Sequence, residues 1–124
     1  MLAIAPEVVA EVSPIVEVIS LNSKEEIEAY IVKRAIETGI PVDRALHVAK
    51  AESHLEPNAT GDLSLICKRT GEAVYARGIY QLTRCYYPQV SDETAFDAKK
   101  NIDYVFDNGL LKEGTCQSQF STCK

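Results

Sequence analysis

The pair Glu52-Ser53 places an acid–base group where apolar neighbours are expected. Apolar residues precede the pair at helical spacing, and the same stripe continues to Glu52. A carboxyl group among apolar neighbours loses hydration, which disfavours its charged form and raises its pKa. A raised pKa suits a general acid that works near neutral pH. Glu52 is therefore the first candidate for a catalytic group in this chain.

The helix that must carry Glu52 begins near Pro41, a residue suited to a first helical turn. Its apolar stripe consists of Val42, Ala45, Leu46 and Ala49. Ala45 and Glu52 are seven positions apart, nearly two full turns, so they share a face. The partial negative charge at a helix C-terminus opposes a second negative charge. We expect burial and the helix dipole to raise the pKa of Glu52 together.

An earlier helix is indicated by Ser23 and Glu26, which have the spacing of a capping box. Gly39 is suited to end this helix as a left-handed residue. The expected buried positions recur at intervals of three and four: Ile27, Tyr30, Ile31, Ala35 and Ile36. Two helices separated by a short link are therefore expected before residue 54.

Residues 55–77 break the helical pattern with turn signals. A short β-hairpin is expected from residues 63–67 and 73–75, with residues 69–72 at its tip. A short helix is expected from 78 to about 83. The sequence thus predicts a small β element directly after the helix that carries Glu52.

Asp97 is suited to cap a last helix, which Asn108-Gly109 would end or distort. The expected inner face of this helix contains Ala98, Ile102, Val105 and Phe106. Ser91-Asp92 indicates a turn before it, and residues 113–124 show no periodicity. The predicted fold class is α+β and mainly helical.

The composition fits one globular domain and limits the partners. The chain has 124 residues, 46% hydrophobic and 25% charged, with a net charge of -5. This acidic balance offers no basic surface for nucleic acid. No apolar run is long enough to span a bilayer. We expect residues 23–124 to form the domain and residues 1–22 to form an N-terminal arm or linker.

The four cysteines form an even set in the second half of the chain. No Cys-x-x-Cys pair is present, and both histidines are in another region, which argues against zinc and leaves no metal or cofactor expected. Two disulfides are favoured, with three possible pairings. Cys116 with Cys123 would close a short loop, and Cys67 with Cys85 would tie the loop region to the segment after Gln81. Disulfides indicate an exported protein in an oxidising compartment, whether periplasmic, wall-associated or extracellular.

Three segments in order resemble the lysozyme-like lytic transglycosylases, the superfamily of soluble lytic transglycosylases and goose-type lysozymes. Residues 52–59 (ESHLEPNA) resemble the catalytic signature, which is Glu-Ser, a spacer with an apolar residue, and Pro-x-Ala. Residues 78–81 (GIYQ) resemble the Gly-Leu-x-Gln segment. Residues 95–102 resemble the start of a later helix in the family. The resemblance covers about residues 24–112.

The resemblance implies a lysozyme-like fold with the hairpin beside an active-site cleft, and a monomer acting on peptidoglycan glycan strands. Glu52 would be the single general acid and base, with Ser53 beside it. Gln81 would line the sugar cleft, and the Gly78 backbone would allow close approach. Asn101 would support the helix start. The family's later Ala-Tyr-Asn-Ala-Gly-like segment is missing, and residues 60–77 are longer than usual.

Several alternatives stay open at this point. A muramidase-type hydrolase would use Asp62 to assist water, and a non-catalytic glycan-binding module would need no acid. Ser53 could bond a backbone carbonyl instead of Glu52. One or two members of a tyrosine cluster could stack on sugar, and Tyr80 is the first choice among Tyr75, Tyr80, Tyr86 and Tyr87.

Overall fold

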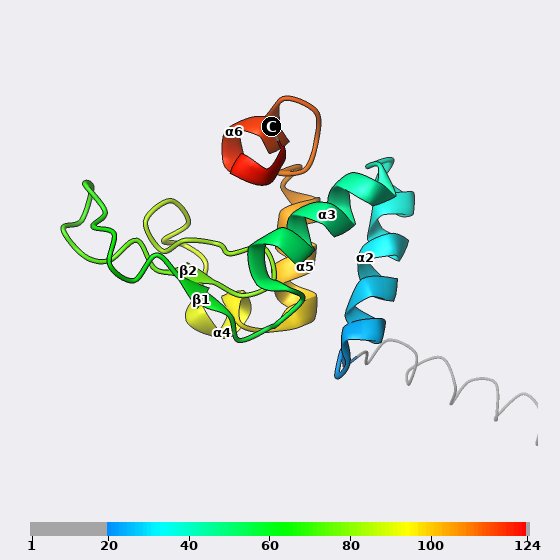
Figure 1. Cartoon of the computed structure of the whole chain (residues 1–124), viewed down its shortest axis with the longest axis horizontal. Coiled ribbons are helices and arrows are strands. Elements are labelled where there is room, and N and C mark those ends of the chain that lie inside the picture. The colour runs from blue at the N-terminus through cyan, green and yellow to red at the C-terminus, as the bar shows by residue number, and fades with distance from the viewer. Residues whose placement is uncertain (1–19, 124) are drawn as a thin grey trace, which may run out of the picture.

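The computed structural model describes residues 20–123, which form a mainly helical architecture with a small antiparallel sheet. Figure 1 shows the longer helices together and a β arm, residues 60–77, extending away from them. The elements in chain order are α2 (Lys24–Thr38), α3 (Val42–Ser53), β1 (Thr60–Gly61), β2 (Ala76–Arg77), α4 (Asp92–Ala95), α5 (Ala98–Asp107), α6 (Thr115–Gln119) and the 3-10 turn η1 (Ser121–Cys123). The predicted α+β class is confirmed at this level.

Helix α2 begins and ends where its local sequence predicts. Ser23 accepts a hydrogen bond from the Glu26 backbone, and the Glu26 side chain accepts one from the Ser23 backbone. Gly39 ends the helix with a left-handed backbone (φ 76°). The prediction that Ile36 is buried is wrong, since its side chain is 69% exposed. Ile36 follows the buried Ala35 by one position, a rotation of about 100° that turns it away from the core.

Helix α3 packs against α2 and carries Glu52 in its last turn. Pro41 precedes the helix as its N-cap, and His54 ends it with a left-handed backbone. The buried positions are Ala45, Val48, Ala49 and Ser53. The observed core face is therefore centred on Val48 and Ala49, and Glu52 lies at its edge, half-buried.

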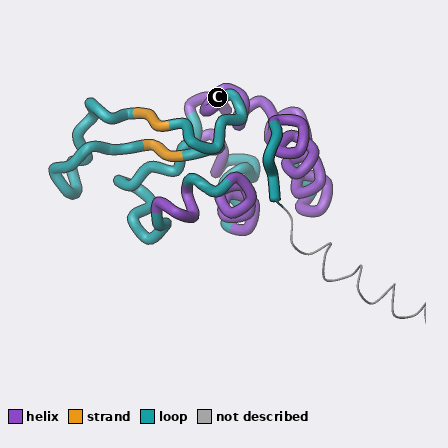
Figure 2. The backbone as a smooth tube through the Cα atoms, turned by 90° about the horizontal axis from the view of Figure 1, so that it is seen from below, coloured by secondary structure: helices purple, strands orange, loops and turns teal. Residues whose placement is uncertain are grey.

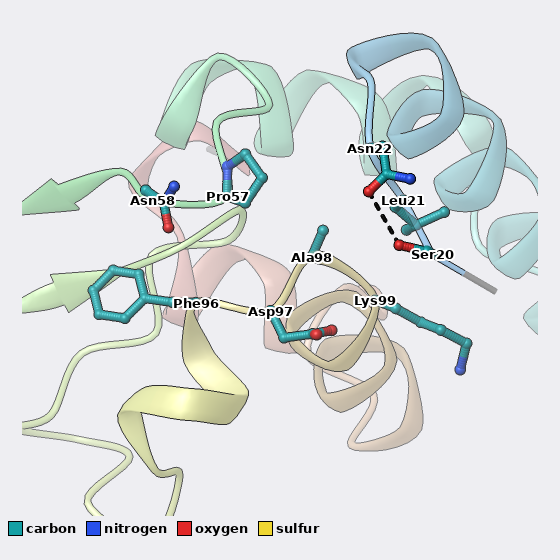
Figure 3. Close-up of a pocket in the computed structure, with 9 residues that line it drawn as sticks. All are labelled: Ser20, Leu21, Asn22, Pro57, Asn58, Phe96, Asp97, Ala98 and Lys99. Carbon is teal, nitrogen blue, oxygen red and sulfur yellow. Dashed lines mark hydrogen bonds between the residues drawn. The ribbon is translucent and has the colours of Figure 1, made fainter. Parts of the chain in front are cut away.

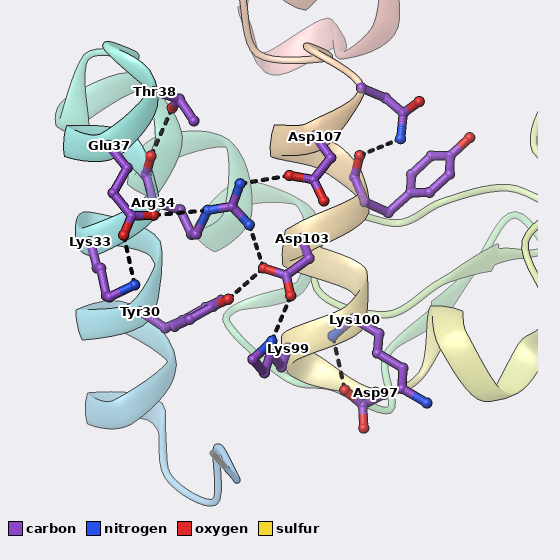
Figure 4. Close-up of polar contacts among 12 residues, drawn as sticks. Tyr30, Lys33, Arg34, Glu37, Thr38, Asp97, Lys99, Lys100, Asp103 and Asp107 are labelled. Atoms are coloured by element: carbon purple, nitrogen blue, oxygen red, sulfur yellow. Dashed lines mark hydrogen bonds and ion pairs between the residues drawn. The ribbon is translucent and has the colours of Figure 1, made fainter. Parts of the chain in front are cut away.

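Helix α5 lies beside α2 and is joined to it by a polar network, shown in Figure 4. Asp97 caps α5 by accepting a hydrogen bond from the Lys100 backbone, as predicted. Asp103 is the centre of the network: its carboxylate accepts hydrogen bonds from Tyr30, from Arg34 (2.6 Å) and from Lys99 (2.8 Å). Burial by itself raises the pKa of Asp103, but these three donors outweigh it and hold the pKa below its ordinary value of 3.8.

We expect Asp103→Asn to lower the free energy of unfolding by about 1.5 kcal/mol at pH 7, because three donors lose their charged acceptor. A depressed folded-state pKa stabilises the fold above the unfolded-state pKa and loses that effect as pH falls through the folded-state value. The difference in free energy of unfolding between Asp103→Asn and wild type should therefore shrink below about pH 4. Urea denaturation at pH 7 and pH 3 measures it. Asp107→Asn, at an exposed carboxylate on the same Arg34, should cost less than about 0.5 kcal/mol.

The β arm is a hairpin whose regular pairing lies at its base. Thr60 pairs with Arg77 and Gly61 with Ala76, and one bridge farther out joins Ile66 to Ala73. Figure 2 shows the two strands side by side. The prediction of strands at 63–67 and 73–75 is therefore wrong in its bounds. The left-handed backbone at Asp62 (φ 55°) and Tyr75 (φ 57°) interrupts the ladder between the base and the bridge.

Residues 78–81 form turns, so the prediction of a short helix from 78 to 83 is wrong. Gly78 (φ 79°) and Gln81 (φ 53°) have left-handed backbones, which a continuous right-handed helix excludes. The Leu82 amide donates to the Arg77 carbonyl (2.9 Å) and closes the segment. The disulfide Cys67–Cys85 (Cα–Cα 5.6 Å) ties the β arm to the chain beyond this turn, as expected.

Two short helices were missed by the sequence prediction. Helix α4 replaces the expected turn at Ser91-Asp92, and Ser91 caps it by accepting a hydrogen bond from the Thr94 backbone. Helix α6 and η1 occupy the tail, which was expected to lack regular structure. The second expected disulfide, Cys116–Cys123 (Cα–Cα 5.7 Å), closes this tail loop, and buried Phe120 anchors it in the core.

The described residues leave most of the expected N-terminal arm, residues 1–22, outside the structure. Within residues 20–22, Leu21 packs against the core and the Asn22 amide donates to Glu26. In the described part of the chain, no helix is long and apolar enough to cross a membrane.

Candidate functional site

The Glu52 carboxyl lies at the end of α3, half-buried, beside the tail loop. Its Oε2 accepts a hydrogen bond from the Thr122 hydroxyl of η1 (3.5 Å). Burial raises the pKa of Glu52, and the negative charge of Asp62 raises it further, while the Thr122 hydrogen bond opposes both. A carboxyl group with these neighbours keeps its proton at higher pH than an exposed glutamate. It can therefore donate that proton to a bound ligand as a general acid.

A groove of about 540 Å³ lies between the β arm and the tail loop. Its arm wall contains Asp62, Leu65 and Val74, and its tail wall contains Ser118, Gln119 and Phe120. The remaining lining residues are Gln81, Thr83, Tyr86 and Tyr87. This mixture of apolar, aromatic and hydrogen-bonding side chains is suited to a sugar chain, which has apolar faces and polar edges.

Asp62 connects the groove to Glu52. It is an exposed residue of the arm wall, and its charge acts on the Glu52 carboxyl. The main chain holds it in place, because the Tyr75 amide donates to the Asp62 carbonyl (3.3 Å) across the arm. Asp62 and Gln81 line the groove, whereas Glu52 is not among its lining residues and is linked to it by the charge of Asp62.

Gln81 lines the groove and also fixes its loop. Its Nε2 donates to the carbonyls of Ala59 (3.1 Å) and Gly78 (3.0 Å), so the amide connects the residue before β1 to the turn. A Cβ added at Gly61 would lie 2.6 Å from Gln81 Oε1, so a side chain there would require the Gln81 amide to shift. Both readings of Gln81, cleft residue and loop-fixing amide, agree with this position.

Ser53 supports the helix and makes no hydrogen bond to Glu52. It is buried, and its hydroxyl donates to the Ala49 carbonyl one turn earlier (3.1 Å). The sequence left open whether Ser53 bonds Glu52 or a backbone carbonyl, and in the structure it bonds the carbonyl.

Tyr80 does not line the groove, which corrects the choice made among the tyrosines. Its side chain is completely buried, and its hydroxyl donates to the Ala45 carbonyl of α3 (2.8 Å). Tyr86 and Tyr87 are the tyrosines of the groove. The Tyr87 hydroxyl donates to Gln119 Oε1 of the tail wall.

Gly78 and Asn101 are core residues as well. Asn101 is fully buried; it donates to the carbonyls of Arg77 and Ala95 and accepts from the Tyr80 amide (3.0 Å). A Cβ at Gly78 would collide with the Ala95 carbonyl oxygen, so the close approach at Gly78 is to α4 and not to a ligand. Both residues hold the turn that carries Gln81.

No family model, curated protein or solved structure matches this chain. The family resemblance of residues 52–59, 78–81 and 95–102 therefore stays a prediction.

The tail contributes site residues that the sequence did not single out. These residues lie between the paired cysteines Cys116 and Cys123, in a segment without a periodic pattern: Gln119, Phe120 and Thr122. The only sequence signal was the pair of cysteines itself, which indicates a closed loop but not where that loop packs.

A second hollow of about 300 Å³ lies near the start of α5, as Figure 3 shows. Its lining residues are Ser20, Leu21, Asn22, Pro57, Asn58, Phe96, Asp97, Ala98 and Lys99. None of the proposed site residues lines it. Within residues 20–123, no group of three or more His, Cys, Asp or Glu side chains is placed to hold a metal ion.

Proposed function

We propose that this chain cleaves the glycan strands of peptidoglycan as a lytic transglycosylase, with Glu52 as its single acid and base. The observation that carries the proposal is the Glu52 carboxyl, half-buried at the end of α3, whose pKa is raised by burial and by Asp62. The groove between the β arm and the tail loop contains Asp62, Gln81 and two tyrosines, and this lining supports a sugar polymer as the ligand.

The proposed reaction uses one carboxyl group twice, first as an acid and then as a base. Protonated Glu52 donates to the oxygen of the MurNAc-GlcNAc β-1,4 bond, and that C–O bond breaks with oxocarbenium character at the MurNAc carbon. The MurNAc 6-hydroxyl then attacks the same carbon and gives its proton to the Glu52 carboxylate. The product is a 1,6-anhydro ring, no water is consumed, and the enzyme regains its proton.

A lysozyme-like fold and an exported location belong to the same proposal. The fold is supported by a helix that ends at the acid, a small sheet next to it and a helical core. Export is supported by the two disulfides, since such bonds persist mainly in oxidising compartments.

The second candidate is a lysozyme-type hydrolase, and Asp62 favours it. Asp62 lines the groove, and its charge acts on Glu52, as that of an assisting second carboxylate would. In this reaction Asp62 would help water attack in place of the 6-hydroxyl. For a hydrolase, the wild-type protein would form products with reducing ends, and the Asp62→Asn variant would lose cleavage.

Product analysis tests the proposal and separates the candidates. Purified peptidoglycan is incubated with the protein, and the soluble products are measured by mass spectrometry. Anhydro ends, one water lighter than reducing ends, are expected. Reducing ends would assign the hydrolase. Binding to the wall without any soluble product would contradict both enzymes and leave a glycan-binding module.

A further inference from the structure

We propose that Thr122 is the positioning residue of Glu52, held in place by the disulfide-closed tail loop. The proposal rests on the proposed function of Glu52. Thr122 lies 70 positions after Glu52 in the chain, yet its hydroxyl donates to Glu52 Oε2 (3.5 Å). Both residues are half-buried, so solvent competes only in part for this contact.

The tail loop has several independent attachments that fix Thr122. The disulfide joins Cys116 of α6 to Cys123, the residue after Thr122. Phe120 is buried and lies against the ring of Tyr80 (6.0 Å between centroids). The Cys123 amide donates to the Phe120 carbonyl (3.0 Å), and η1 packs against α3. Thr122 is therefore presented to Glu52 by a loop with little freedom of its own.

The hydroxyl has two effects on the acid. It occupies Oε2, and since no hydrogen bond to Oε1 occurs within residues 20–123, the other oxygen is left for the glycosidic oxygen. It also stabilises the carboxylate that forms when Glu52 has given up its proton. Burial and Asp62 both disfavour that carboxylate, and Thr122 offsets them in part, so that one group can serve as acid and then as base.

Charged groups near Glu52 lie on the β arm and in the chain next to Glu52. Asp62 of the β arm acts on it directly. Close to Glu52 in the sequence, Lys50 pairs with Glu28 (3.6 Å) and Glu56 pairs with Lys24 (3.1 Å), so both side chains form ion pairs with α2. The tail loop offers the Thr122 hydroxyl and no charged group between its cysteines.

Thr122→Val tests the proposal, because valine keeps the shape and removes the hydroxyl. The carboxyl signals of the full chain are titrated by ¹³C NMR, with Glu52→Gln to assign Glu52. We expect the pKa of Glu52 to rise by roughly half a unit in Thr122→Val. Thr122→Ser should restore the wild-type value, and Ser121→Ala, the exposed neighbour, should not change it. An unchanged pKa in Thr122→Val, or an equal shift in Thr122→Ser, would overturn the proposal.

The pH dependence of cleavage gives a second readout. The basic limb of the rate profile follows loss of the Glu52 proton, so it should move upward in Thr122→Val by the same amount as the NMR value. A double variant, Cys116→Ser with Cys123→Ser, should move both readouts in the same direction by freeing the loop. If wild type cleaves no peptidoglycan, the proposed function fails, whereas the NMR titration still decides whether Thr122 sets the state of Glu52.

Discussion

Glu52→Gln is expected to lower the rate of peptidoglycan cleavage by roughly 10³-fold, because glutamine cannot deliver a proton to the leaving oxygen. The amide has nearly the same size, and Glu52 lies at the edge of the core, so the fold should be retained. Release of soluble fragments from purified walls measures the rate, and thermal denaturation checks the fold. Replacing a carboxyl of raised pKa by a neutral amide should leave stability equal or slightly higher at pH 7.

Glu56→Gln is the matched control. Glu56 lies four positions after Glu52, beyond the end of α3, is exposed, and pairs with Lys24 at the surface. The Glu56→Gln variant should cleave at the wild-type rate and keep its fold, since a surface ion pair contributes little to the free energy of unfolding. Equal cleavage by Glu52→Gln and wild type would remove Glu52 from the reaction, whatever the products are.

Arg77→Met is expected to lower the free energy of unfolding by about 3 kcal/mol, the largest effect on stability outside the apolar core. Arg77 is 1% exposed and donates to the carbonyls of Leu82 (3.0 Å), Val90 (2.8 Å) and Tyr87 (3.2 Å). Methionine fills similar volume but leaves these acceptors without their donor. The midpoint of thermal unfolding should fall by roughly 10 °C.

Arg84→Met provides the comparison, because Arg84 bonds the same exposed Asp92 as Arg77 does. Its side chain is 46% exposed and lies over the Tyr75 ring (4.5 Å to the centroid). We expect a loss below about 1 kcal/mol. Equal losses in both variants would show that the ion pair with Asp92, and not the buried carbonyls, accounts for the effect of Arg77.

The sequence predicted those parts of the fold that depend on local signals. Ser23 with Glu26, Gly39 and Asp97 each act on backbone groups within a few residues, and each has the predicted role. The placement of Glu52 at the end of a core-facing helix followed from periodicity alone. Ile36 shows the limit of periodicity, since one position of rotation separates a core residue from an exposed one.

The site could not be completed from the sequence, because its other residues depend on tertiary packing. Tyr80 and Gln81 are neighbours, yet Tyr80 enters the core and Gln81 lines the groove, since left-handed backbones at both ends of the turn set their directions. Thr122 contacts Glu52 in a tail loop that is anchored where Phe120 packs beside Tyr80. No local pattern encodes contacts between segments this far apart.

The two disulfides have a mechanical consequence for the groove. Cys67–Cys85 cross-links the β arm to the segment after its turn, and Cys116–Cys123 cross-links the tail loop to itself. Within the described residues neither bond crosses from the arm wall to the tail wall, where contacts such as the one between Tyr87 and Gln119 are noncovalent. Each wall therefore keeps its own shape while the distance between the walls can change. A strand too bulky for the groove would have to displace the tail loop, which would break noncovalent contacts alone: the packing of Phe120 on Tyr80 and the Thr122 hydrogen bond to Glu52.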